Sequence, residues 1–171
     1  MRLTDSEETR QILQQRARNL AQRRGQHQQR QVLVDAIVVE RSDSRLGFPI
    51  DAASEVRRVK ITSIPGAHPP VEGLFQVRGQ GYLLFDLHNL FFGVADSLDH
   101  GDTTLALIIE RRGRTMGLRI DQVIGSRTVY QDELHEEETE KKLPFVSHIT
   151  DDVLNLIDLN RLFRHLDTSA R

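Results

Sequence analysis

Residues 36–59 read AIVVERSDSRLGFPIDAASEVRRV, and the same pattern returns 70 positions later as ALIIERRGRTMGLRIDQVIGSRTV, residues 106–129. The two copies align without a gap, and 8 of the 24 aligned pairs are identical. Ordinary residue frequencies would give about one or two identities by chance. The chain therefore contains an internal repeat. The identical pairs are Ala36/Ala106, Glu40/Glu110, Arg41/Arg111, Gly47/Gly117, Ile50/Ile120, Asp51/Asp121, Arg57/Arg127 and Val59/Val129.

A second repeated block follows each copy, now at a shift of 72 positions. Residues 82–91, YLLFDLHNLF, align with residues 154–163, LNLIDLNRLF. Each copy passes from an apolar strand into Asp-Leu-x-x-Leu-Phe, a pattern typical of a short helix that turns its apolar side chains back onto a sheet. Asp86 and Asp158 stand directly before these helices, so both are predicted to be N-caps rather than catalytic acids.

The rest of the repeat favours strands. Short β-branched runs alternate with turn residues from Val32 onward, which predicts an all-β barrel or sandwich. Glu40–Gly47 and Glu110–Gly117 are predicted to be hairpins. Each half then has a hairpin, a long connecting strand, a further strand and a capped helical turn. We interpret this as a duplicated small β-barrel.

The first 30 residues form a separate arm in this interpretation. Thr4 and Glu7 have capping-box spacing, which predicts a helix from Thr4 to about Gln22. The apolar stripe of this helix is narrow, so we expect it to be mobile or docked on another surface. The Gln-rich stretch from Gly25 to Gln31 is predicted to be a linker. The basic residues between Arg16 and Arg30 are interpreted as a solvated arm.

Composition excludes several classes of protein. The chain has no cysteine, so it has neither a disulfide nor a cysteine-based zinc site. Its apolar runs are far shorter than the roughly 20 residues that a membrane helix needs, and no signal peptide is evident at its start. We therefore expect a cytoplasmic protein without direct membrane insertion. The net charge of -2 gives no general attraction to nucleic acid.

An enzyme is not expected. The seven histidines show no metal-ligand spacing, and the sequence has neither a phosphate-binding glycine loop nor a serine in a nucleophile elbow. We predict no catalytic residue, no metal and no cofactor. The alternative function is that of a small-barrel nucleic-acid-binding module. That function needs stacking aromatics on a basic face, whereas aromatics make up 5% of this chain.

The two halves diverge most in one segment of each copy. Because the shared fold does not require particular residues there, a specific binding site is expected in such a segment. In the first half this segment is ITSIPGAHPPVEGLFQVRGQG, residues 61–81. Its Pro65-Gly66 pair suits a tight turn, and Gly73–Gly79 is predicted to form a hairpin arm. The matching segment of the second half is acidic between Asp132 and Glu140 and is interpreted as a solvated loop.

The run ITSIPGAHPPVEGLFQVRGQGYLLFDLHNLF, residues 61–91, resembles the signature of the CheW family of chemotaxis coupling (adaptor) proteins. In that signature a Pro-Gly turn, a Val-x-Gly step, an Asn-Leu-Arg-Gly hairpin and a Val-Asp-Leu strand end follow in this order. The resemblance covers about residues 32–166. It departs from the signature at Gln76, where Asn is usual, and at Gly81, where a branched apolar residue is usual.

The resemblance implies a fold and a function. It implies a CheW-like domain over residues 31–168, built of two SH3-like five-stranded β-barrels at about 31–95 and 102–168, with strand exchange between them left open. It also implies a non-catalytic adaptor of bacterial chemotaxis-like signalling. The implied partners are the regulatory domain of a CheA-type histidine kinase and the cytoplasmic tip of a methyl-accepting chemoreceptor, so that the protein would be recruited to receptor arrays.

The resemblance also assigns partner-binding residues. The Arg-Gly of the family falls on Arg78 and Gly79, the glycine that opens the hairpin on Gly73, and the Glu-Val step on Glu55 and Val56. For Arg78, the other interpretation is an ordinary surface arginine beside a turn glycine. Arginine is enriched at interface hot spots, which supports a binding role.

Overall fold

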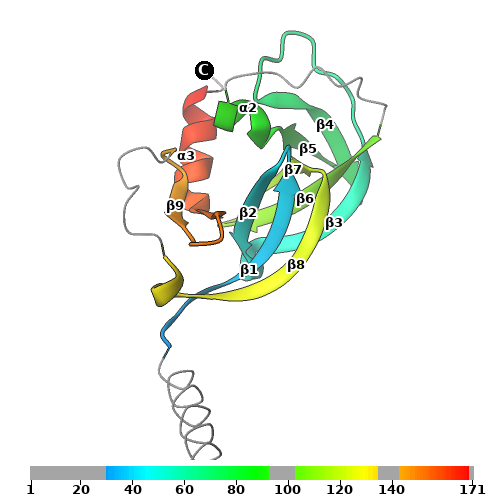
Figure 1. The fold of residues 1–171 in the computed structure, drawn as a ribbon. Coiled ribbons are helices and arrows are strands. Elements are labelled where there is room, and N and C mark those ends of the chain that lie inside the picture. The colour runs from blue at the N-terminus through cyan, green and yellow to red at the C-terminus, as the bar shows by residue number, and fades with distance from the viewer. Residues whose placement is uncertain (1–29, 93–102, 135–142, 170–171) are drawn as a thin grey trace, which may run out of the picture.

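The structure is a computed structural model that describes residues 30–92, 103–134 and 143–169. The predicted N-terminal helix and most of the acidic segment lie outside these residues. The described part is built mainly of β-strands, which form two five-stranded sheets accompanied by short helices (Figure 1).

We name the two sheets A and B. The strand order of sheet A is β8 (Gln122–Tyr130), β1 (Val32–Arg41), β2 (Ser44–Pro49), β10 (Leu154–Ile157) and β9 (Val146–Ile149). The order of sheet B is β3 (Ala53–Lys60), β6 (Thr103–Arg111), β7 (Arg114–Ile120), β5 (Gln80–Phe85) and β4 (Val71–Val77). The helices are η1 (Ile50–Ala52), α2 (Leu87–Phe92), η2 (Gln131–Glu133) and α3 (Leu159–Ser169).

Each sheet closes on itself through one bridge between its edge strands. In sheet B, Thr62 and Leu74 exchange two backbone hydrogen bonds, of 2.7 and 2.8 Å, just beyond the end of β3. In sheet A the corresponding bridge joins Leu134 and Thr150, after β8 and β9. A five-stranded sheet whose edges meet in this way has the form of a small barrel.

Both sheets draw strands from both halves of the repeat. The β1–β2 hairpin of the first half pairs with β8 and, in parallel, with β10, which belong to the second half. The β6–β7 hairpin of the second half pairs in the same way with β3 and β5 of the first half. The hairpins are therefore exchanged between the halves, which a sequence repeat alone does not reveal.

Exchange is possible because the first strand of each hairpin is buried on both faces. In β1, Ala36 and Val38 fill the interior of sheet A, whereas Val39 joins the main core between the two sheets. In β6, Ala106 and Ile108 fill the interior of sheet B, whereas Leu107 and Ile109 join the same main core. Continuous apolar runs such as AIVV and ALII are typical of strands that are covered on both sides.

The main core also takes the helices. Leu87 of α2 and Leu159, Leu162 and Leu166 of α3 all pack into it. Asp86 Oδ1 accepts a hydrogen bond from the backbone N–H of His88 at 3.0 Å, and Asp158 Oδ1 accepts one from Arg161 at 3.1 Å. Both aspartates therefore cap the helices that follow them. The prediction of an all-β fold with two five-stranded, SH3-like sheets and short capped helices is confirmed.

Asp86 has a second contact that the sequence did not predict. Arg41, at the end of β1, donates from Nε and Nη2 to both carboxylate oxygens of Asp86, each at 2.8 Å. Its Nη1 donates to Asp121 Oδ1 at 3.0 Å. The Arg41 residue is 2% exposed, so this ion pair joins sheet A to the α2 cap in a site that water hardly reaches. Truncating Asp86 would remove two hydrogen bonds from a buried guanidinium group and leave its charge compensated mainly by Asp121, whose side chain is 45% exposed.

The two caps should therefore differ in their contribution to stability. Asp86→Ala is expected to cost about 3–5 kcal/mol because Arg41 stays buried, whereas Asp158→Ala should cost about 1 kcal/mol as the loss of an ordinary cap. Urea denaturation of both variants measures the difference. The double variant Arg41→Met/Asp86→Ala should recover part of the loss, and equal costs for the two single variants would contradict the role given to Arg41.

Candidate functional site

The predicted Arg78-Gly79 pair forms the tip of the β4–β5 hairpin. Val77 and Gln80 are the last paired residues, so the turn has two residues. Their φ values are 51° at Arg78 and 80° at Gly79, as a type I′ turn requires. Both residues are exposed. This tight turn fixes the backbone at the tip of the hairpin, where the Arg78 side chain is exposed to solvent.

The outer face of the same hairpin is partly apolar. Phe75 and Val77 point inward and are 1% and 8% exposed, whereas Leu74 is 39% exposed and lies opposite Leu83, which is 38% exposed. Alternation left open which of these side chains faced the core, and the structure assigns Leu74 to the outside. Gln76 follows on the outer face, opposite Gly81, which has no side chain to cover it. The two exposed leucines form an apolar spot on this face, and arginine is among the residue types enriched at interfaces.

Gly73 lies where the barrel of sheet B closes. A Cβ atom at this position would stand 2.5 Å from the Thr62 carbonyl oxygen and 2.8 Å from the Ile61 side chain. Leu74, the next residue, pairs with Thr62 in the bridge that closes the barrel. The structure thus gives Gly73 a packing role, and its contact with a partner stays a prediction.

Glu55 and Val56 lie on β3, the strand that the Thr62–Leu74 bridge joins to β4. Val56 packs against the main core, and Glu55 Oε1 lies 3.5 Å from Arg57 Nη1 on the same strand. Because β3 and β4 run antiparallel at the bridge, Glu55 and Arg78 lie on the same side of it. The structure places the five predicted residues on β3, on β4 and in the β4–β5 turn of sheet B, whose two edge strands the Thr62–Leu74 bridge joins. Their binding role stays a prediction.

A second exposed apolar surface lies on sheet A. Val123 and Ile124 of β8 are 41% and 49% exposed. Their repeat equivalents on β3 are Ala53 and Ser54, which are small. The apolar pattern of the sequence did not predict the exposure of Val123 and Ile124, although the two copies of the repeat diverge at these positions.

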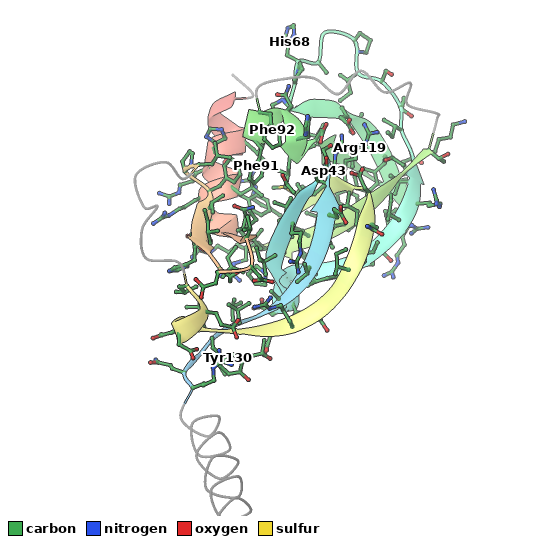
Figure 2. The ribbon with its side chains drawn as sticks, viewed as in Figure 1. Asp43, His68, Phe91, Phe92, Arg119 and Tyr130 are labelled. Carbon is green, nitrogen blue, oxygen red and sulfur yellow. The ribbon has the colours of Figure 1, made fainter. Side chains whose placement is uncertain are left out.

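Ion pairs of Arg30 anchor the chain just before β1. Arg30 donates from Nε to Asp132 Oδ2 at 2.8 Å and from Nη2 to Glu133 Oε1 at 2.7 Å. Its guanidinium carbon lies 4.3 Å from the centre of the Tyr130 ring, at the end of β8 (Figure 2). The hydrogen bond to Asp132 raises the pKa of Arg30 above its ordinary value. These contacts fix the position of the segment that follows the N-terminal arm.

The ion-pair cluster continues across sheet A. Arg127 of β8 contacts Glu133 through Nη2 and donates from Nη1 to Asp152 Oδ2 at 2.8 Å. The Thr150 hydroxyl donates to Asp152 Oδ1 at 2.6 Å. This hydrogen bond, with the charge of Arg127, lowers the pKa of Asp152 below its ordinary value. Arg127 was identified only as a repeat identity, and the structure shows that it links β8 to the β9–β10 turn.

The acidic and histidine side chains that the structure describes do not gather into a metal site. Within residues 30–92, 103–134 and 143–169, no group of three His, Cys, Asp or Glu could hold a metal ion. In the same described ranges, none of the helices combines the length and the apolar character needed to span a bilayer.

Comparison with known proteins identifies the family. A model of the CheW-like domain matches residues 35–167, and the chain belongs to this family. Among solved structures, the scaffolding protein TtCheW from Thermoanaerobacter tengcongensis is similar, with a TM-score of 0.61 and 24% identity over 73% of this chain and 88% of that chain. This likeness supports the fold. A search among curated proteins gave no match. The family match fits the prediction that the chain is not an enzyme.

Two glycines of the β4–β5 hairpin provide a test of the packing role of Gly73. Gly73→Ala should destabilise the protein by about 1–3 kcal/mol, because the new methyl group meets the Thr62 backbone. Gly81→Ala should change stability by about 0.5 kcal/mol or less, since nothing lies within 4 Å of its Cβ position. Thermal and urea denaturation of both variants measure this difference. A neutral Gly73→Ala would show that the closure of sheet B tolerates a side chain.

Proposed function

We propose that this protein is a non-catalytic adaptor that couples a methyl-accepting chemoreceptor to a CheA-type histidine kinase. Membership of the CheW-like family supports this role. The observation that carries it is the presence of two exposed apolar surfaces on different sheets: Leu74 and Leu83 on sheet B, and Val123 and Ile124 on sheet A. An adaptor needs two binding surfaces that can be occupied at the same time.

The β4–β5 hairpin is proposed as the receptor-facing surface. Leu74 and Leu83 form a cross-strand apolar pair on which one face of a receptor helix can lie. Arg78, at the adjoining tip, supplies a charged donor that selects and orients the partner. Glu55, on the neighbouring strand β3, adds an acceptor of opposite charge on the same side of the barrel closure.

The β8 surface of sheet A is proposed for the kinase regulatory domain. Val123 and Ile124 are branched and apolar, and both are exposed at a register shift of β8, where Ile124 has no pairing partner on β1. Contact with a partner would remove this apolar area from water, which is favourable by about 25 cal/mol per Å². With the receptor on sheet B, both partners can bind to one rigid body.

The same proposal accounts for location. An adaptor of this kind works in the cytoplasm and reaches the membrane only through the receptor array. The nucleic-acid alternative is less well supported, because the two surfaces present aliphatic side chains rather than stacking aromatics. A salt titration against single-stranded DNA is expected to show no binding in the micromolar range at physiological ionic strength.

Charge reversal at Arg78 tests the receptor surface. Arg78→Glu should leave the fold intact, because the side chain is exposed at a turn, and should abolish receptor-dependent control of the kinase. Charge reversal at an interface can cost several kcal/mol, so receptor affinity should fall by about tenfold or more. The measurement is a reconstituted assay with receptor, kinase and adaptor, with circular dichroism of the variant.

Arg78→Lys is the matched control, because it keeps the charge at the same turn position and should retain much of the coupling. Full kinase activation and attractant inhibition by folded Arg78→Glu would contradict a coupling role of this residue. Glu55 and the surface around β3 would then be the better candidates for receptor contact.

Polar substitution on β8 tests the kinase surface. Val123→Ser/Ile124→Ser should weaken binding of the kinase regulatory domain by about tenfold, through the loss of buried apolar area, and should leave receptor binding unchanged. Val153→Ser is the control, since Val153 is 67% exposed in the β9–β10 turn of the same sheet. Pull-down and calorimetry with each partner separately distinguish the surfaces. Equal weakening by the control would contradict a specific role of β8.

A further inference from the structure

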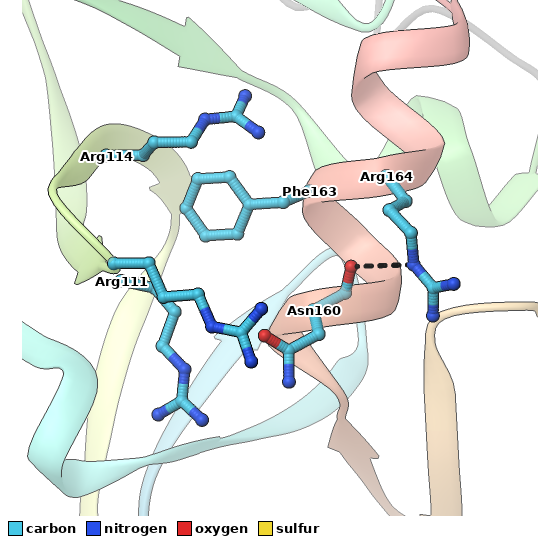
Figure 3. Close-up of a pocket in the computed structure, with 6 residues that line it drawn as sticks. Arg111, Arg114, Asn160, Phe163 and Arg164 are labelled. Carbon is cyan, nitrogen blue, oxygen red and sulfur yellow. Dashed lines mark hydrogen bonds between the residues drawn. The ribbon is translucent and has the colours of Figure 1, made fainter.

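A basic cavity lies between the β6–β7 hairpin and helix α3. It has a volume of about 420 Å³ and is lined by Arg111, Arg112, Arg114, Asn160, Phe163 and Arg164. Figure 3 shows the Arg114 side chain beside the Phe163 ring, with Asn160 and Arg164 on the same helix, α3. The lining thus combines four guanidinium groups, one amide and one ring, and it includes no carboxylate.

Two of the arginines build the wall. The Arg114 guanidinium lies 4.8 Å from the centre of the Phe163 ring and donates to both carboxylate oxygens of Asp167, at 2.6 and 2.9 Å. Arg164 Nε donates to the Asn160 carbonyl oxygen at 3.3 Å, one turn back on α3. These contacts hold the two side chains in place at the cavity.

The other two arginines carry charge that the residues described by the structure compensate weakly. Arg111 Nη1 lies 3.8 Å from Asp51 Oδ2, and the Asp51 side chain is 74% exposed, so water screens that pair. Arg112 stands at the hairpin tip with a φ of 52°, and its side chain makes no ion pair or hydrogen bond with the described residues. Together they present about two positive charges to the cavity.

The equivalent positions in the first half of the repeat do not carry this set of arginines. There the equivalent of Arg111 is Arg41, which is 2% exposed and paired with both Asp86 and Asp121. The hairpin positions that match Arg112 and Arg114 are Ser42 and Ser44, and Phe92 matches Arg164. Because the two copies of the repeat differ at these positions, the shared fold does not require these arginines.

We propose that this cavity binds a phosphoryl group. A phosphoryl dianion carries about -1.5 to -2 charges at pH 7, which matches the charge offered by Arg111 and Arg112. The planar forks of arginine suit bidentate contacts to phosphate oxygens, and the Asn160 amide adds a neutral donor. A single carboxylate would satisfy only half of this charge. The site lies on a different hairpin from Arg78, so it is separate from the proposed receptor surface.

Titration of the full chain with pyrophosphate, followed by NMR at constant ionic strength, tests the proposal. Saturable shifts should concentrate on the β6–β7 hairpin and α3. Arg112→Gln should weaken binding by about threefold or more, and Arg111→Gln/Arg112→Gln by about tenfold or more, since each removes a charge-assisted contact. The single variant changes an exposed turn residue, which keeps the test valid if the double variant is unstable.

Arg78→Gln is the matched control, because Arg78 occupies the same turn position, with a φ of 51° against 52° at Arg112 and a glycine following in both. It should leave pyrophosphate binding unchanged. No saturable binding in the millimolar range would overturn the proposal. An equal loss in Arg78→Gln would overturn it as well, because the interaction would then be general surface electrostatics.

The source of the phosphoryl group is distinguished by three further ligands. Inorganic phosphate, a phosphoserine peptide and the same peptide with glutamate are compared with pyrophosphate. Tighter binding of the free anions supports a free phosphate ligand, and tighter binding of the phosphoserine peptide supports a phosphorylated protein segment. Glutamate peptide binding as tight as that of the phosphoserine peptide would overturn the preference for phosphoryl groups.

Discussion

The fold depends on the burial of the β1 and β6 strands on both faces. A strand with AIVV or ALII at its centre cannot leave either face in water without exposing large apolar side chains. Each strand meets this constraint by filling the interior of one barrel with alternate side chains and the shared core with the others. The shared core contains side chains from both sheets and from α2 and α3. Neither barrel can therefore keep its packing if the other is removed.

The two halves differ at the ends of β1 and β6, where each strand carries an arginine of the repeat, Arg41 or Arg111. Arg41 is buried against Asp86 and Asp121, and three hydrogen bonds to their carboxylates compensate its burial. Arg111, its repeat equivalent, lies 3.8 Å from the exposed Asp51 carboxylate and lines an open cavity instead. Arg41 and Arg111 are thus two copies of one arginine of the repeat. The surrounding substitutions made one a part of the scaffold and left the other available to a ligand.

The sequence predicted the parts of the structure that depend on local pattern. The repeat, the caps at Asp86 and Asp158 and the turn at Arg78-Gly79 all depend on neighbouring residues, and all are present. The exchange of hairpins was left open, because pairing within a half and pairing between halves satisfy the same apolar alternation. The orientation of Leu74 and Phe75 was also undetermined, since it depends on the register shift between Val71 and Gly73. The surface at Val123 and Ile124 was missed because adjacent apolar residues normally indicate burial.

A shared core also bears on how such a protein can work as an adaptor. If the two barrels were joined only by a linker, a receptor bound to sheet B could move without affecting a kinase bound to sheet A. Here the two surfaces belong to one packed unit, and packed cores transmit displacement because they contain few voids that could absorb it. The Arg41–Asp86 pair lies between the sheets and adds a directional contact to that packing. A displacement of one sheet is therefore expected to be passed to the other through the shared core, and the exchange of the hairpins is what builds that core from both halves of the chain.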